Sequence, residues 1–320
     1  MRRVIGSKLH RLVRTSPVMF TRRFPKPGAG FDGRMLFPFL LRCELIGYTL
    51  LTMPEQDVTH FTAVDHTGDP AFFLNFLDQA NKIPAVMEWK LIILDGLRLR
   101  PGMKVLDLGC GAGHDAFDIA CRVGSGGHIT GVDFSEFLIT EAIRRASGRN
   151  LPVSFEVGDA HSLRFPDASF DAVRTERMLM HVPDPGKALA EMVRVLKPGG
   201  RLAVQDVDWE TQFCDSPYKD TTRKIALSFC DGIKNGWIGR RLPRLFREAH
   251  MTDITVSFRT VTLTYDFLQL LLGGHIARAI SHGVLSKDEA DRWWTQLAHA
   301  NAEGSFLYGF TAFVVSGLKL

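Results

Sequence analysis

The chain has 320 residues, of which 45% are hydrophobic and 23% charged, so it can bury a sizeable core as one large or two smaller globular domains. Its five cysteines form no C-x-x-C pair, which fits a reducing compartment better than a disulfide framework and gives no indication of structural zinc or another metal site. The formal net charge of +4 is unevenly distributed along the chain.

Positive charge is concentrated at the N-terminus, where residues 1–34 hold nine lysines and arginines against a single acid. We expect a basic extension over residues 1–58, either as a solvated arm or as a membrane-surface contact through residues 1–53, where apolar residues adjoin the charges. Arg42 and Glu44 interrupt the apolar run, so no transmembrane span is expected there. The protein is expected in the cytoplasm, free or peripheral at a membrane, although an Arg-rich arm would also suit an organelle transit peptide in a eukaryotic source.

A helical cap is predicted over residues 59–100, ahead of the first strand. Asp69 and Pro70 supply an N-cap acid and a proline at the first helical position. Apolar residues then recur at helical spacing, namely Phe72, Phe73, Phe76, Leu77 and Ala80. This stripe either packs in the core or forms a lid over an acceptor pocket, and a second helix is predicted over residues 85–96.

A buried strand and a glycine-rich loop follow the cap. An apolar run that contains Asp107 leads into Gly109, Gly111 and Gly113, which lack a Cβ and so let the backbone adopt positive φ and approach a ligand closely. A helix is predicted directly after the loop, and its free N–H groups would point at the ligand. This unit is typical of a site for a nucleotide-like cofactor.

The next two predicted strands also end in acids. The second strand ends in Asp133, 20 residues after Gly113, where a carboxylate in a βαβ unit can accept hydrogen bonds from the hydroxyls of a ribose. The third ends before Asp159 and Ala160, and Asp159 could accept a hydrogen bond from the amine of an adenine.

Strands and helices continue to alternate through a core predicted over residues 101–209. The remaining core elements are a strand over 169–175, a helix over 185–196 and a strand over 201–205 that runs on to Asp206 and Asp208. This alternation predicts a doubly wound α/β fold with a mostly parallel sheet, which binds its ligand at the carboxyl ends of the strands.

Residues 210–320 are expected to add helical cap insertions and the closing strands of the same domain. The predicted elements are helices over 218–238, 239–250, 267–281 and 286–301 and strands over 252–265 and 306–316. The first of these helices would lie where the rim of the sheet is open, so it could cap an acceptor site.

Four motifs together resemble those of the class I S-adenosylmethionine-dependent methyltransferases. They are VLDLGCGAG at 105–113, GVD at 131–133, GDA at 158–160 and VLKPGG at 195–200. The nearest resemblance is to the small-molecule branch that includes the ubiquinone and menaquinone methyltransferases, and it covers about residues 85–210. It implies a Rossmann-like sheet of seven strands with the last strand antiparallel, and S-adenosyl-L-methionine as the cofactor.

The resemblance also implies roles for individual residues. The cofactor-binding set would be Asp107, Gly109, Gly111, Gly113, Asp133, Phe134, Asp159, Ala160 and Arg177. In this set Asp107 would order the loop and the amino end of the cofactor, and the glycines would meet its methionyl part. Asp133 would hold the ribose, Asp159 and Ala160 would meet the adenine, and Phe134 would pack on the adenine ring.

Methyl transfer is an in-line displacement that depends mainly on placement, and a general base is needed only when the acceptor arrives protonated. Candidate bases at the rim are His181, Glu176, His161 and His114, each of which also has a structural interpretation. We take His181 and Glu176 as the catalytic candidates. Glu176 and Arg177 also stand where this family meets its cofactor or substrate.

Three other functions stay open at this point. An NAD(P)-dependent oxidoreductase would share the strand, loop and ribose acid, but its loop has the spacing G-x-G-x-x-G. A nucleic-acid or protein methyltransferase could use the basic arm, but the arm has few aromatic residues and no Asn-Pro-Pro-Tyr-like signature follows the fourth strand. A non-catalytic protein that kept the fold would be expected to lose cofactor contacts.

We favour a small lipophilic acceptor, such as a quinone, an isoprenoid-like compound or a secondary metabolite, methylated on carbon or oxygen. Aromatic and apolar segments on both sides of the core motivate this hypothesis. It predicts an acceptor cavity lined mainly by apolar side chains, with no nucleic-acid partner.

Overall fold

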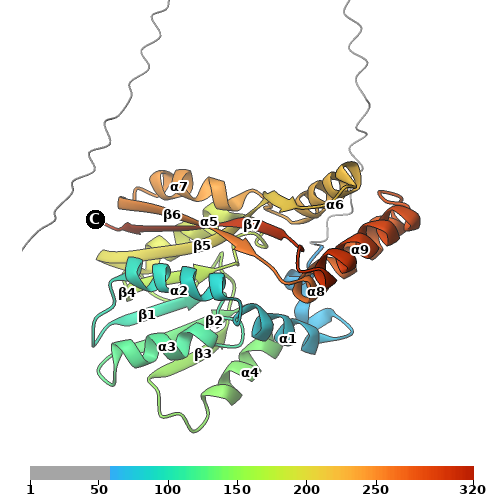
Figure 1. The fold of residues 1–320 in the computed structure, drawn as a ribbon. Helices are drawn as coiled ribbons and strands as arrows, with labels where there is room; N and C mark the ends of the chain where they lie inside the picture. The colour runs from blue at the N-terminus through green and yellow to red at the C-terminus, as the bar shows by residue number, and fades with distance from the viewer. Residues whose placement is uncertain (1–57) are drawn as a thin grey trace, which may run out of the picture. The chain divides into compact units, whose positions relative to one another are not determined.

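The computed structural model describes residues 58–320, so the predicted extension over 1–58 and its membrane contact through 1–53 lie outside the described residues except for Val58. The described part contains a seven-stranded sheet in the order β3-β2-β1-β4-β5-β7-β6 (Figure 1). The strands are β1 Lys104–Leu108, β2 His128–Asp133, β3 Val153–Val157, β4 Phe170–Glu176, β5 Leu196–Cys214, β6 Thr252–Thr262 and β7 Tyr308–Leu318. Strands β1 to β5 pair in parallel and β7 is antiparallel to both of its neighbours, which confirms the predicted fold class.

Helices cover both faces of the sheet. The helical elements are η1 Phe61–His66, α1 Pro70–Ala80, α2 Pro84–Leu97, α3 His114–Val123, α4 Glu136–Ala146, α5 Pro185–Val195, α6 Lys219–Gly232, α7 Ile238–Glu248, α8 Tyr265–Ser281 and α9 Lys287–Ala302. Gly96 of α2 packs against Ser316, whereas Phe246 of α7 packs against Gly317. Because adjacent residues of a strand face opposite sides, α2 and α7 lie on opposite faces.

Several helices lie at the carboxyl end of the parallel strands. Figure 1 shows α1, α6, α8 and α9 on the right, beyond the carboxyl ends of β1 to β5. Caps foreseen from the sequence begin these and neighbouring helices: Asp69 accepts the N–H of Phe72 at 3.3 Å, and Ser135 accepts the N–H of Leu138 at 3.2 Å. No helix among residues 58–320 is long and apolar enough to cross a bilayer.

The structure corrects two predicted elements. Strand β5 runs on to Cys214 instead of ending near Asp208, because its pairing with β7 continues to that residue. The helix predicted over 218–238 ends at Gly232 as α6, since the chain then turns so tightly that a Cβ on Gly236 would lie 2.3 Å from the carbonyl oxygen of Cys230.

Candidate active site

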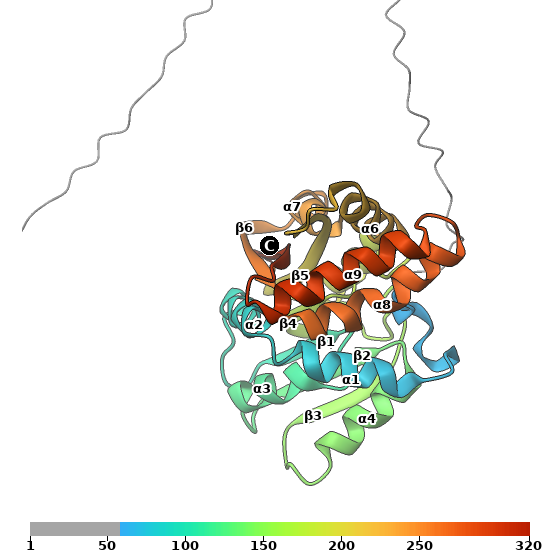
Figure 2. The ribbon, with the colours of Figure 1, turned by 45° about the vertical axis from the view of Figure 1, so that its right-hand side comes forward.

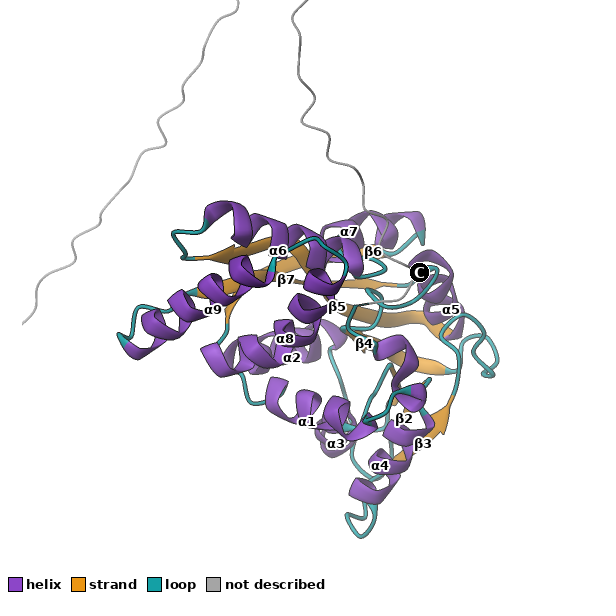
Figure 3. Cartoon of the chain, turned by 90° about the vertical axis from the view of Figure 1, so that its right-hand side faces the viewer, coloured by secondary structure: helices purple, strands orange, loops and turns teal. Residues whose placement is uncertain are grey.

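A cavity of about 570 Å³ lies at the carboxyl ends of β1, β2 and β4, within the ~300–1,000 Å³ typical of small-molecule sites. The glycine loop after β1 forms one side, and Phe61 of η1 with Phe76 and Leu77 of α1 form another. Figure 3 views the molecule from the side on which the parallel strands end, with α1 and α8 in front of them. The cavity is therefore where a doubly wound sheet binds its ligand.

The glycine loop is held in a conformation that only glycine adopts freely. Gly109 and Gly111 have φ angles of 73° and 53°, in the left-handed region that other residues avoid. A Cβ on Gly109 would also lie 2.7 Å from Cγ of Met178. Both glycines line the cavity, so their bare backbone forms a cradle that side chains would fill.

Asp133 closes this loop from the end of β2. Its Oδ2 accepts a hydrogen bond from the N–H of Gly111 at 2.8 Å and its Oδ1 accepts one from Ser135 at 3.0 Å. Burial raises the pKa of the Asp133 carboxyl above its ordinary value, although these N–H donors oppose the shift. Each carboxylate oxygen has a second lone pair, so Asp133 can still accept hydroxyl donors from the cavity that it lines. Phe134 follows on the cavity wall with 66% of its surface exposed.

Asp159 and Ala160 line the cavity at the end of β3. Asp159 Oδ1 accepts the backbone N–H of His161 at 2.9 Å and lies 2.7 Å from its ring Nδ1. Since the ring Nε2 accepts the N–H of Asp184 at 3.3 Å, a neutral ring has its proton on Nδ1 and donates it to Asp159. Hydrogen bonding from His161 lowers the pKa of the Asp159 carboxyl. His161 thus orients an acid and is no longer a candidate base.

Six charged side chains form a buried charge cluster beneath the glycine loop, between α2, α3 and β4. They are Lys90, Asp107, Asp115, Arg174, Glu176 and Arg177. Arg174, which is 2% exposed, is at the centre: its Nη1 contacts Oδ1 of Asp107 at 3.0 Å and Oδ2 of Asp115 at 2.8 Å, and its Nη2 contacts Oε2 of Glu176 at 2.8 Å. Lys90 Nζ lies 2.6 Å from Asp115 Oδ1 and 3.2 Å from Glu176 Oε2.

Within the cluster, the pKa values of Asp107 and Asp115 are shifted in opposite directions. Burial raises the pKa of Asp107 to about 7, with Arg174 acting against it. Burial also disfavours the charged form of Asp115, but Arg174 and Lys90 together hold its pKa well below the ordinary range. At neutral pH Asp107 is therefore near its titration point, whereas Asp115 stays ionised.

Glu176, a catalytic candidate from the sequence, belongs to this cluster. Its Oε2 is shared by Arg174 and Lys90, and its Oε1 lies 2.9 Å from Nη2 of Arg177. Arg177 also lies over the ring of Trp89 at 5.9 Å and has a φ angle of 53°, a strained value for a residue with a Cβ. Both Glu176 and Arg177 line the cavity, so their charges face its contents.

Sequence reasoning missed Lys90, Asp115 and Arg174, which all line the cavity. Arg174 had a usable signal, because it is a charged residue inside a strand whose neighbours Val173 and Thr175 are fully buried. Lys90 and Asp115 had none, since a single charged residue in an amphipathic helix is ordinary.

Asp107 and Gly113 are placed differently from the other predicted cofactor residues, because neither lines the cavity. Asp107 lies under the loop, 1% exposed, where it contacts Arg174. Gly113 begins α3 with a φ angle of 78°, and a Cβ there would lie 2.7 Å from Cζ of Phe155. Both residues support the loop from below instead of contacting the cavity.

His181 lies where the cavity meets η1. It is 9% exposed, its ring centroid is 5.4 Å from that of Phe61, and its Nδ1 is 3.4 Å from Oγ1 of Thr59. It lines the cavity together with Met180 and Val182. This histidine thus stands beside apolar side chains of the cavity wall.

A buried acid in β5 interacts with His181. Asp206 is fully buried, and its two carboxyl oxygens accept backbone N–H groups of Met180 at 3.1 Å and Val207 at 3.0 Å. Burial raises the pKa of Asp206 to about 7, while the charge of His181 opposes this shift.

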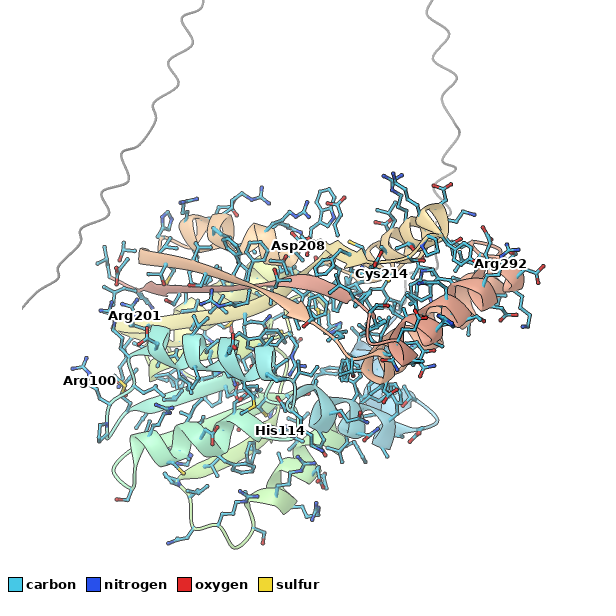
Figure 4. All side chains as sticks on the ribbon, viewed as in Figure 1. Arg100, His114, Arg201, Asp208, Cys214 and Arg292 are labelled. Atoms are coloured by element: carbon cyan, nitrogen blue, oxygen red, sulfur yellow. The ribbon has the colours of Figure 1, made fainter. Side chains whose placement is uncertain are left out.

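Ionic contacts fasten η1 and α1 beside the cavity. Asp78 of α1 contacts Nε2 of His114 at 2.5 Å and Nη2 of Arg145 at 2.9 Å, and Figure 4 labels His114 where α3 begins beside α1. Burial lowers the pKa of His114, whose ring is used in joining these helices and not as a base. Asp65 of η1 accepts the N–H of Glu136 at 2.8 Å at the start of α4.

Comparisons with known proteins agree with this geometry. The family model described as "Methyltransferase domain" matches residues 99–250. The chain is 39% identical over 249 residues to an uncharacterised 37.1 kDa protein in transposon TN4556 of Streptomyces fradiae, covering 76% of this chain and 70% of that one. It is 41% identical over 145 residues to a 2-phytyl-1,4-naphtoquinone methyltransferase of Synechococcus elongatus, covering 45% of this chain and 59% of the relative.

A solved structure shows the same fold. Haemonchus contortus phosphoethanolamine N-methyltransferase 2, in complex with S-adenosyl-L-methionine, aligns with a TM-score of 0.52 and 20% identity, over 83% of this chain and 60% of its own. The chain thus spans about three fifths of this structure and of the quinone methyltransferase. The family match excludes the oxidoreductase alternative. The chain belongs to the class I S-adenosylmethionine-dependent methyltransferases, enzymes of EC 2.1.1, and is of the small-molecule kind.

Proposed function

We propose that the protein methylates carbon or oxygen of a small lipophilic acceptor and that His181 takes up the acceptor's proton. The observation behind this proposal is the composition of the cavity wall around His181. Phe61, Phe76, Met180 and Val182 line the same cavity as His181 and give it apolar surface, which favours a ligand that is itself apolar. Nucleic acid and protein acceptors are disfavoured, since a cavity of about 570 Å³ has the size of a small-molecule site.

The residues along the strand ends fit S-adenosyl-L-methionine, which supplies an electrophilic methyl group when bound. Asp133 would accept the ribose hydroxyls, and Asp159 with Ala160 would meet the adenine beside Phe134. The bare backbone of the glycine loop would hold the methionyl part. The chemistry of these residues supports the assignment, because the carboxylates of Asp133 and Asp159 accept hydrogen bonds and the ribose hydroxyls and adenine amine of the ligand donate them.

Charges in the wall suggest how the zwitterionic end of the cofactor is held. Lys90 and Arg177 offer cations to a carboxylate, whereas Asp115 and Glu176 offer anions to an ammonium group, and all four line the cavity. These side chains already compensate one another through ion pairs of 2.6–3.2 Å. A zwitterion would add one charge of each sign and leave the balance unchanged, which avoids the cost of an uncompensated buried charge.

His181 is the group placed to hold a proton on the acceptor side. It lines the cavity beside Phe61, and Asp206 interacts with it from β5. His181 would take up a proton from a hydroxyl or an acidic carbon as the acceptor becomes nucleophilic. General bases of this kind contribute typically ~10²–10⁴-fold.

The test measures S-adenosylhomocysteine release with 2-methyl-1,4-naphthohydroquinone and with phosphoethanolamine as acceptors. We expect turnover with the hydroquinone, and a loss of ~10²-fold or more in kcat for His181→Asn, with an unchanged Kd for S-adenosylmethionine. The exposed His282 provides the control His282→Asn, which should behave as wild type. Turnover of phosphoethanolamine alone would refute the lipophilic acceptor, and a fully active His181→Asn would refute the assigned base.

A further inference from the structure

A second cavity of about 330 Å³ adjoins the first. It lies between η1, α1 and α8, and Figure 2 shows α8 running alongside α1. Phe61 and Phe76 line both cavities, and their ring centroids are 5.6 Å apart. Two aromatic side chains therefore form the partition between the space beside His181 and a further space outside the cofactor site.

The far side of this second cavity is formed by α8, which carries a pair of glycines in its middle. Gly273 and Gly274 lie inside a helix of 17 residues, where glycine is unfavourable relative to alanine because it loses more conformational freedom on folding. A Cβ added at either glycine would have no neighbour within 4 Å. Close packing therefore does not explain why these two positions are glycine. Gly274 lines the cavity and Gly273 does not. Gly274 is exposed and an added Cβ would meet open space, so the cavity opens to the surface beside it.

The remaining lining is suited to an uncharged apolar guest. Phe72, Phe73, Leu270 and Leu271 contribute aromatic and aliphatic surface. His275 also lines the cavity and is 2% exposed; burial lowers its pKa to about 4, so it is neutral at pH 7.

The polar groups on this wall include one unsatisfied atom. Nε2 of His275 lies 3.0 Å from Oγ of Ser228, but its Nδ1 is buried without a hydrogen-bond partner among the described residues. Asp69 accepts the N–H of Phe72 as the cap of α1, so this carboxylate has a structural task.

We infer that the second cavity holds the apolar chain of the methyl acceptor, whose reacting end lies beside His181, and that Gly274 sets the length of chain that fits. This inference rests on the proposed function, because it assumes a lipophilic acceptor. The chain would cross at Phe61 and Phe76, which both cavities share, and one of these two rings would turn to admit it, because their centroids are 5.6 Å apart. Acceptors with a chain should bind more tightly than those without one, since each buried methylene removes apolar surface from water.

The test compares wild type, Gly274→Leu and Gly273→Leu with 2-alkyl-1,4-naphthohydroquinones whose alkyl group ranges from methyl to dodecyl. Gly274→Leu should raise KM for the long homologues roughly tenfold or more, as expected when a hydrophobic pocket loses space for part of its substrate, and leave KM for the methyl homologue unchanged. Gly273→Leu places the same side chain on the same helix outside the cavity and should keep the wild-type dependence on chain length. Both variants replace a helical glycine in open space, so both should melt at or above the wild-type temperature.

The outcomes separate this inference from the function on which it rests. Equal KM values for Gly274→Leu and Gly273→Leu across the series would overturn the chain site while leaving the methyltransferase assignment intact. If wild type methylated no homologue, the lipophilic acceptor would be wrong. The cavity is also tested without turnover by the fluorescence of N-phenyl-1-naphthylamine: weaker binding to Gly274→Leu alone supports an apolar site there, and equal binding to all three proteins overturns it.

Discussion

Removal of Arg174 is the sharpest test of the buried charge cluster. The substitution Arg174→Met keeps most of the side-chain length and removes the charge that contacts Asp107, Asp115 and Glu176 at 2.8–3.0 Å. Those three carboxyl side chains would then share only Lys90 and Arg177 as cations. Because removing one partner of a buried ion pair leaves an uncompensated charge, we expect a loss of about 3–5 kcal/mol in the free energy of unfolding.

The pH dependence of this loss follows from the sign of each pKa shift. Asp115 has a folded-state pKa held below that of the unfolded chain, so it contributes stability above about pH 4 that is lost as the pH falls through its folded pKa. Without Arg174 its pKa should rise, which removes that contribution at neutral pH. The difference between wild type and Arg174→Met should therefore be largest near pH 8 and smaller near pH 4.

Urea unfolding of wild type and Arg174→Met at several pH values measures the difference. A matched control is Arg144→Met, because Arg144 pairs with Glu141 at 2.6 Å on the surface with 71% of its side chain exposed, and exposed pairs contribute little. A loss below about 1 kcal/mol for Arg174→Met, or the same small change for both variants, would refute the reasoning that Arg174 neutralises buried carboxylates.

Three further predictions follow from the loop and the strand ends. Asp133→Ala should weaken S-adenosylmethionine binding by ~10-fold or more in calorimetry while the protein stays folded, and an unchanged affinity would contradict its role. Gly109→Ala should cost about 1–3 kcal/mol, because its φ angle is 73° and a Cβ would lie 2.7 Å from Met178; Gly124→Ala, with φ of 64° and open space, should cost less. Asp206 has its pKa raised from 3.8 to about 7, so its contribution to stability is present at low pH and lost as the pH rises through 7. Asp206→Asn should therefore flatten the pH dependence of unfolding between pH 5 and 8, and parallel curves for the two proteins would count against the shift.

Local sequence patterns were sufficient for much of the fold. The glycine spacing after β1 and the caps at Asp69 and Ser135 each depend on neighbours in the chain, so they could be recognised without tertiary information. The doubly wound, mostly parallel character of the sheet followed from strand and helix alternation, and the family resemblance implied seven strands with the last one antiparallel. The errors lay where pairing with distant strands decides the outcome, as in the extension of β5 along β7 to Cys214.

The site, like the fold, was predictable from the sequence only in part, for a physical reason. By itself the sequence determined which residues stand at the ends of the strands, because a parallel sheet brings those ends to one edge; Asp133, Asp159 and Gly109 all line the cavity as expected. Only the tertiary structure decided the charge state and the partners of buried groups. Arg174 contacts Asp107 across 67 residues, and the cavity beside Gly274 forms only where α8 packs against α1. Electrostatics and cavity shape depend on distances between segments that are remote in the chain, and no local pattern encodes those distances.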